Sequence, residues 1–179
     1  ETADLFQYKV TYQEHYNMLP MFCEQKTTIS LSSDGVVQLP PITVKRVVSK
    51  ISYNLTAKPA DMELKSVQLI SIPRTAVVFA PDGTAADNPD DYTDSPETTL
   101  TGQRAAGSYY MLPNRQGVNT SITDQKQKNA DNAPACASWL LIRATRGSKV
   151  LAYSVYLGEN NTSDFNVRAN CHYRLNITL

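Results

Sequence analysis

The last nine residues of this 179-residue chain alternate strictly between apolar and polar side chains. The apolar set is Cys171, Tyr173, Leu175, Ile177 and Leu179, and the residues between them are His172, Arg174, Asn176 and Thr178. A repeat of two residues predicts a β-strand with one buried face. A helix would need apolar residues three and four positions apart, and no window keeps that spacing over three turns. We therefore predict an all-β fold.

Other segments also have the character of strands. The stretch from Ile42 to Leu55 alternates less cleanly, and its predicted inward residues are Val47, Ile51, Tyr53 and Leu55. The stretch from Ser138 to Leu157 predicts a hairpin whose connection contains Gly147. Two short strands flank Pro73, and Asp34-Gly35 predicts a further hairpin turn. Many short strands joined by turns are typical of a β-sandwich.

Two long polar segments interrupt this pattern and are predicted to be loops. They run from Ala80 to Gly107 and from Asn114 to Ala135, with an apolar and aromatic stretch, Ser108 to Pro113, between them. Loops of this length are either functional or disordered.

Composition and charge exclude several classes of partner. Lysine and arginine together number 17, as do aspartate and glutamate, so the formal net charge is zero. We expect no nucleic-acid partner, because there is no basic field to attract one. No apolar run approaches the length of a membrane span. The three cysteines, Cys23, Cys136 and Cys171, lack zinc-site spacing; they allow one disulfide at most, and buried free thiols are the alternative.

The sequence offers no basis for catalysis. His15 and His172 lie outside any recognised catalytic arrangement, and we interpret both as surface residues. The acidic stretch from Asp87 to Asp94 lacks the glycine and the distal glutamate of an EF-hand calcium loop, so we interpret it as a solvated loop. We expect no enzyme activity, no catalytic residues, no cofactor and no metal.

Four stretches occur in the order found in a known family. They are MLPMFCE (Met18–Glu24), VKRVVSKISYNL (Val44–Leu55), YYMLPNRQG (Tyr109–Gly117) and the closing strand pair from Tyr153 to Leu179. They resemble the PM-small-E segment, the R-x-V-A-K-I strand, the Y-x-x-P-x-N-x-x-G segment and the closing strand pair of fimbrillins. The chain thus resembles the fimbrillin-like subunits of Bacteroidales type V fimbriae.

This resemblance implies a Greek-key, transthyretin-like β-sandwich. Residues 41–179 would form the fimbrillin-like domain, and residues 1–40 would be an N-terminal segment left from an upstream β-domain. Family members usually carry a whole β-domain before the PM segment, whereas only about twenty residues precede it here. Cys23 and Cys171 also depart from the family, because small or polar residues are expected at these positions.

The resemblance further implies a mode of assembly. Such subunits are exported as lipoprotein precursors, displayed at the outer membrane and trimmed by proteolysis, after which a strand from a neighbouring subunit fills the groove that opens. An open sheet edge favours this mode independently of the resemblance, because it presents unpaired backbone groups that an added strand can satisfy. A head-to-tail contact that never closes builds a filament. The strand expected at this site carries Tyr173, Leu175, Ile177 and Leu179.

We therefore expect a structural or accessory subunit of a cell-surface fimbria. It would assemble with other fimbrial subunits by β-strand exchange and support adhesion. The alternative is a surface binding module, such as a tip adhesin or a carbohydrate-binding sandwich, whose partners are surface glycans or proteins. Exposed loop aromatics would favour this alternative, and its candidates are Tyr92, Tyr109 and Tyr110. A plainer interpretation of the last strand, as a core strand of a monomeric domain, also stays open.

Overall fold

The computed structural model describes residues 7–23, 25, 35, 37, 39–83 and 85–179. These residues form strands, loops and two short 3-10 turns, η1 (Pro89–Asp91) and η2 (Gln125–Gln127), and they contain no α-helix. The prediction of an all-β sandwich is confirmed. The predicted hairpin around Asp34-Gly35 falls largely outside the described residues.

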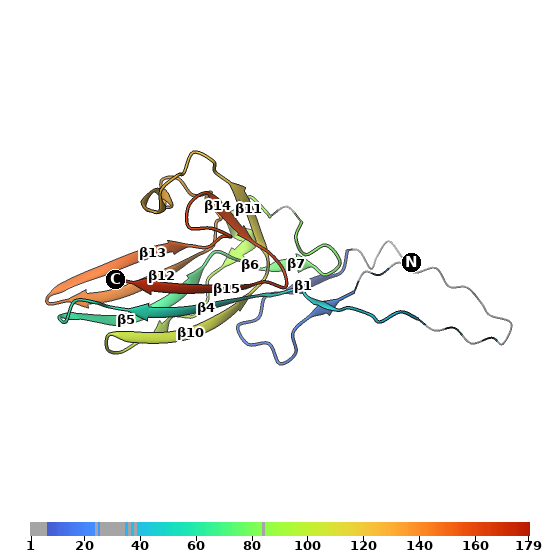
Figure 1. Ribbon diagram of the computed structural model, residues 1–179, viewed down its shortest axis with the longest axis horizontal. Helices are drawn as coiled ribbons and strands as arrows, with labels where there is room; N and C mark the ends of the chain where they lie inside the picture. Colours follow the sequence, from blue (N-terminus) through green and yellow to red (C-terminus); the bar gives the residue numbers. More distant parts are fainter. Residues whose placement is uncertain (1–6, 24, 26–34, 36, 38, 84) are drawn as a thin grey trace.

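Two sheets, in which most neighbouring strands are antiparallel, form the body of the molecule (Figure 1). The larger one has the strand order β13 (Lys149–Tyr156), β12 (Trp139–Arg146), β5 (Met62–Ile70) and β9 (Thr98–Thr99). The smaller one has the order β10 (Arg104–Met111), β4 (Ser49–Thr56) and β15 (His172–Thr178). β15 runs parallel to β4, while the other strand pairs of both sheets are antiparallel. Because a parallel neighbour cannot be reached through a tight hairpin, β15 joins β4 only after a long crossing of the fold.

The inner faces of the two sheets pack on one hydrophobic core. The predicted inward residues of β4 (Ile51, Tyr53 and Leu55) are buried, at 4 % exposure or less. They belong to the same cluster as Leu64, Val67 and Leu69 of β5 and Leu140, Ile142 and Ala144 of β12. The predicted hairpin from Ser138 to Leu157 is β12 and β13, which pair residue by residue from Trp139–Tyr156 to Arg146–Lys149.

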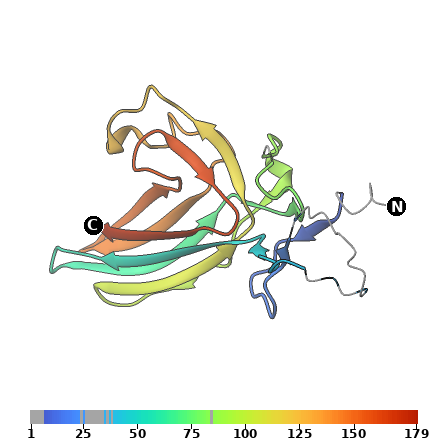
Figure 2. The same ribbon diagram turned by 45° about the vertical axis from the view of Figure 1, so that its right-hand side comes forward.

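A smaller core attaches the N-terminal segment to one end of the sandwich (Figure 2). β1 (Lys9–Thr11) pairs with β7 (Thr75–Val77), and β2 (Met21–Phe22) pairs with β3 (Lys45–Arg46). The buried residues of this core are Val47, Val48, Val78 and Leu112, and Tyr12, Tyr16, Leu19 and Phe22 pack against them. Val47 is therefore buried as predicted, although in this smaller core. The expected domain boundary at residue 40 stays a prediction.

The two predicted loops contain strands. The first loop contains two short strands, β8 (Tyr92–Thr93) and β9, and it ends inside β10. β8 pairs with β6 (Ile72–Pro73). The second loop begins with β11 (Asn114–Val118), which pairs with β14 (Asp164–Val167). The prediction was wrong at these positions because polar residues there are satisfied within the fold. Asn114 is fully buried, and its amide donates to the carbonyl of Cys136 and to the hydroxyl of Ser138 at 2.8 Å each.

Gly107 gives the ring of Tyr53 its space in the core. The two residues are partners across β10 and β4, and the ring centroids of Tyr53 and Tyr109 lie 5.8 Å apart. A Cβ atom at position 107 would overlap the Tyr53 hydroxyl and lie 2.6 Å from its Cζ. Any side chain here must therefore push a buried aromatic ring out of place.

We predict that Gly107→Ala lowers the free energy of unfolding by about 1–3 kcal/mol, because the displaced ring strains a close-packed core. Urea unfolding followed by circular dichroism measures this. Gly83→Ala is the matched control, since a Cβ there would meet only an ordinary contact at 3.4 Å from the Ala80 carbonyl oxygen. Equal stability of the two variants would contradict the prediction.

Candidate functional site

One long side of the sandwich is closed by a continuous segment. From Thr98 to Met111 the chain passes from β9 of the larger sheet into β10 of the smaller sheet. On the way, Gly102 accepts a hydrogen bond from the Leu64 N–H of β5, and Gln103 accepts one from the Ala57 N–H, both at 2.8 Å. The two sheets are therefore joined by the backbone along this side.

Tyr109 reinforces this closed side from the inside. Its hydroxyl in β10 donates to the carbonyl oxygen of Val67 in β5 at 3.1 Å and lies 3.1 Å from the hydroxyl of Thr98 in β9. A single side chain thus links both sheets, in addition to the backbone crossing.

The opposite long side has no such crossing in the part of the chain that the structure describes. There β13 is the last strand of the larger sheet and β15 is the last strand of the smaller one. The two strands lie side by side in both views (Figures 1 and 2). We call the side of the sandwich that is bordered by β13 and β15 the open seam. Two neighbouring free strand edges are where a sandwich can accept a further strand.

Apolar side chains line the open seam from both strands and are half-buried. β13 contributes Leu151, Tyr153 and Val155, and the C-terminal strand contributes Tyr173, Leu175, Ile177 and Leu179. All seven pack against the main core. The four residues expected at the site from the sequence thus lie together, on one face, at this free edge.

The hydrogen bonds of Leu179 show which backbone groups of β15 face outward. Its N–H donates to the Thr56 carbonyl, and its carbonyl accepts from the Lys58 N–H, both at 2.9 Å. Backbone groups alternate in direction along a strand, so the odd-numbered residues of β15 bond to β4. The N–H and C=O groups of His172, Arg174, Asn176 and Thr178 are therefore directed at the free edge, where an added strand would pair.

The outer face of β15 is polar and exposed. His172 Nε2 lies 2.8 Å from the Ser52 hydroxyl, and the Asn54 amide donates to the Asn176 side chain at 3.0 Å. Desolvation and the charges of Arg174 and Lys50 lower the pKa of His172. His15 is also exposed, with its Nε2 3.3 Å from Glu14. Both histidines lie at the surface, as interpreted from the sequence, and His172 contacts the Ser52 hydroxyl on an exposed strand face.

A cavity of about 110 Å³ lies at one end of the open seam. The end of β13 and the following turn form one wall, and Tyr173 and Leu175 of β15 form the other. Gln125 and Lys128, in and directly after η2, also line it. The Tyr173 hydroxyl accepts from the Arg168 N–H at 3.0 Å and donates to the Asn166 carbonyl at 3.3 Å, which fixes this end of β15.

Lys128 is the unusual residue of this cavity, because its side chain is only 8 % exposed. Its ammonium donates to the Asn160 carbonyl at 2.7 Å and lies 5.1 Å from the centre of the Phe165 ring. Burial lowers the pKa of Lys128 to about 8, and the attraction of Asp164 opposes this only in part. Lys128 lies in the polar stretch from Asn114 to Ala135, which was predicted to be a loop, and nothing in its local sequence marks it as buried.

Asp164 is near Lys128 but is held by other groups. Its carboxylate accepts from the Glu159 N–H at 2.9 Å and from the N–H and side-chain amide of Asn166 at 2.8 Å each. Burial alone would raise the pKa of Asp164, yet these hydrogen bonds, with the charge of Lys128, lower it. None of the ion pairs found among the described residues includes Lys128.

Gly158 allows the turn to close tightly over Asp164 and Lys128. Its φ is 154°, and a Cβ there would overlap the Asp164 carbonyl oxygen and lie 2.9 Å from Lys128 Nζ. Glycine is thus required for the backbone to approach the ammonium this closely.

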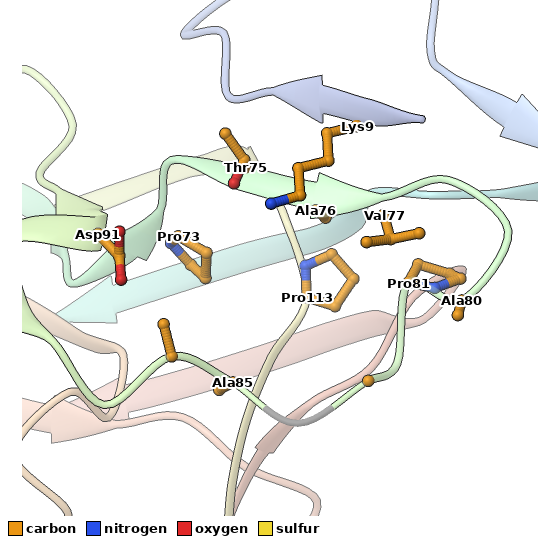
Figure 3. Close-up of a pocket in the computed structure, with 12 residues that line it drawn as sticks. Lys9, Pro73, Thr75, Ala76, Val77, Ala80, Pro81, Ala85, Asp91 and Pro113 are labelled. Carbon is orange, nitrogen blue, oxygen red and sulfur yellow. The ribbon is translucent and has the colours of Figure 1, made fainter. Parts of the chain in front are cut away.

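A second cavity, of about 240 Å³, lies beside β7 (Figure 3). Prolines and alanines line it, including Pro73, Pro81 and Pro113, together with Lys9 and Asp91. It contains no aromatic ring on which a sugar could stack. Most of its lining side chains are the small ones of alanine and proline.

The tyrosines considered as loop aromatics are held by the sandwich. Tyr92 is 7 % exposed, and its hydroxyl donates to the Ala86 carbonyl at 2.6 Å. Tyr109 and Tyr110 lie in β10 rather than in a loop, and Tyr110 packs against the smaller core with Lys50 over its ring. Their interpretation as loop residues was wrong, since their alternation belongs to a strand.

The remaining candidate features are structural. Cys23, Cys136 and Cys171 are free thiols, of which Cys136 is buried. In the acidic stretch, Asn88 caps η1 and Asp94 accepts from the Ser71 N–H at 3.0 Å. The described residues hold no cluster of three or more histidine, cysteine, aspartate or glutamate side chains that could bind a metal ion. Within the same residues, no helix has the length and apolar character needed to cross a membrane.

We compare the free energy of unfolding of the protein with that of a Lys128→Met variant. We predict that the difference shifts in favour of the unmodified protein as the pH rises from 7 to 10. The folded chain releases the lysine proton near pH 8, whereas the unfolded chain keeps it until about 10.4. In this window the unfolded state binds more protons, so raising the pH favours folding. The gain should reach about 1–2 kcal/mol at pH 10.

Urea unfolding of both proteins at a series of pH values measures this difference, and groups that titrate equally in both proteins cancel. A difference that stays flat or falls with rising pH would show that the ammonium is not desolvated.

Comparisons with known proteins place this geometry in a wider context. Residues 109–177 match a family described as a domain of unknown function, DUF4906. No curated protein matches the sequence. Among solved structures, the chain is similar to the tip fimbrial protein Mfa3 from Porphyromonas gingivalis, determined with a C-terminal truncation, with a TM-score of 0.63 at 17 % identity. The likeness covers 99 % of this chain and 67 % of that one. The chain therefore shares its β-sandwich fold with a fimbrial protein, while the Greek-key description stays a prediction.

Proposed function

We propose that this chain is a structural or accessory subunit of a cell-surface fimbria, and that its open seam receives a β-strand from another fimbrial subunit. The observation that carries the proposal is the asymmetry of the sandwich, which is closed by backbone along β9 and β10 and open between β13 and β15. The fold shared with a fimbrial tip protein supports it.

An added strand beside β15 would satisfy both the backbone and the core. The smaller sheet would grow from three strands to four, the number in the larger sheet. The outward N–H and C=O groups of β15 would gain partners, each hydrogen bond contributing about 0.5–1.5 kcal/mol net. Alternate apolar side chains would cover Tyr173, Leu175, Ile177 and Leu179, and full burial of one such side chain contributes about 1.5–3 kcal/mol. These four residues would then form the inner wall of the assembly site.

The proposal extends to location and partners. The chain would act extracellularly, on a fimbria or anchored at the outer membrane after lipoprotein processing, as a member of the fimbrillin-like subunits of Bacteroidales. Its partners would be other fimbrial subunits, and its role would be assembly and adhesion rather than catalysis. Residues 1–40 would form an N-terminal segment, and residues 41–179 the fimbrillin-like sandwich that carries the seam.

The alternative, a surface module that binds glycans, has less support from the described residues. Its three candidate tyrosines are engaged in the sandwich, and the cavity beside β7 lacks an aromatic platform. The open seam is lined by apolar side chains and bordered by the free backbone groups of β15, which suits a peptide strand better than a sugar.

The proposal predicts that a strand-forming peptide binds along β15. The probe is a nine-residue peptide that alternates threonine with isoleucine, with two lysines added before it for solubility. On binding, it should slow hydrogen exchange at the amides of His172, Arg174, Asn176 and Thr178, which face the free edge. Hydrogen exchange read by NMR measures this, and the melting temperature should rise with peptide concentration.

Arg174→Pro provides the matched variant, because proline removes an outward N–H while leaving the bonds to β4 intact. It should weaken peptide binding at least tenfold, whereas Arg174→Ala should bind normally. Protection elsewhere, or equal binding by the two variants, would contradict strand addition at β15. Stabilisation by a panel of glycans without any peptide binding would favour the surface-module alternative.

A further inference from the structure

The apolar lining of the open seam does not by itself define where an incoming strand should stop. Successive inward residues of β15 are all large and apolar, and a slip of two residues keeps the same faces in contact. A unique register needs at least one contact that differs from the others. The cavity at the Tyr173 end supplies a candidate, because Lys128, a charged residue that is only 8 % exposed, lines it.

We propose that Lys128 binds an acidic side chain of the incoming strand and so fixes the register of that strand in the open seam. This inference rests on the proposed function and names the chemistry of its partner. The partner is an aspartate or glutamate at the last inward position of the added strand, after a run of apolar inward residues.

The hydrogen bonding of Lys128 supports this assignment. An ammonium has three N–H donors, and the structure gives Lys128 the Asn160 carbonyl as an acceptor. Asp164, the nearby carboxylate, is bound by the backbone and side chain of Asn166 and by Glu159, and it does not form an ion pair with Lys128. The ammonium therefore keeps donor capacity at the wall of a cavity that opens onto the seam.

An added strand changes the cost of leaving those donors without a partner. By covering the cavity it would exclude the water that now reaches the lysine, and burying an unpaired charge is costly. An apolar side chain over the cavity would impose that cost, whereas a carboxylate would offset it with a charge-assisted hydrogen bond. A strand in the wrong register, with its acidic residue elsewhere, loses this contact and incurs the cost.

The direction of the strand sets the position of the acidic residue. Antiparallel pairing is slightly more stable than parallel pairing, so we expect the new strand to run opposite to β15. Its C-terminal end then lies beside Tyr173, next to the cavity that Lys128 lines. In a nine-residue strand with inward residues at even positions, the acidic residue belongs at position eight.

The test compares the threonine–isoleucine peptide described above with variants that carry glutamate or glutamine at position eight. Binding to the full chain is followed by fluorescence anisotropy. We expect the glutamate peptide to bind at least fivefold more tightly than the glutamine peptide. Moving the glutamate to position four or six should abolish this preference, because those positions lie away from Lys128.

Two variants of the chain separate anchoring from a merely structural role. Lys128→Met removes the charge, and Lys128→Gln keeps a donor for the Asn160 carbonyl should the methionine variant fail to fold. Both should bind the glutamate and glutamine peptides equally, while the matched control Lys149→Gln, at an exposed position of β13, should keep the fivefold preference. If Lys128 served stability alone, the affinities for all peptides would fall in parallel.

The outcomes for this inference and for the proposed function are distinct. Equal binding of the glutamate and glutamine peptides by the unmodified chain, or a glutamate preference that survives both Lys128 variants, overturns the anchor and leaves strand addition standing. Failure of every peptide to bind, with no protection along β15, overturns strand addition and the anchor together.

Discussion

The arrangement of this protein depends on the segment from Thr98 to Met111, which crosses from one sheet to the other. By hydrogen bonding first to β5 and then to β4, it closes one long side of the sandwich with backbone. The same crossing leaves β13 and β15 as the outer strands on the other side. The open seam is thus a consequence of how the opposite side is closed, and it does not depend on any special residue of β15.

Polar groups are buried at one end of the seam, so the two ends of this otherwise apolar surface differ. Asn166, Asp164 and the turn around Gly158 satisfy one another, and Lys128 is packed above Phe165 with a single carbonyl acceptor. A charge in such a place is costly unless something pairs with it. The seam is apolar along its length and carries a cation at one end. The cost of that charge affects the stability of the isolated chain, and the same charge determines the chemistry of what the seam could bind.

The strands were predictable where alternation was complete and where neighbours in sequence are neighbours in space. β12 and β13 form a local hairpin around Gly147, so their pairing could be anticipated from the sequence. β10 was missed, because Arg104 to Gly107 combines small and polar residues at a sheet edge and the following tyrosines were interpreted as loop residues. β11 was missed because Asn114, polar by type, is buried through hydrogen bonds with partners from Tyr92 to Ser138.

The sequence by itself determined the fold class and the inward face of the last strand, because alternation acts locally and each side chain takes its face from its neighbours. It also placed Tyr173, Leu175, Ile177 and Leu179 on one surface. Only the tertiary structure decided that β15 pairs in parallel with β4, that its other edge is free, and that Lys128 lies beside Tyr173. These features join residues far apart in the chain, and long-range pairing depends on how whole sheets pack rather than on any local pattern.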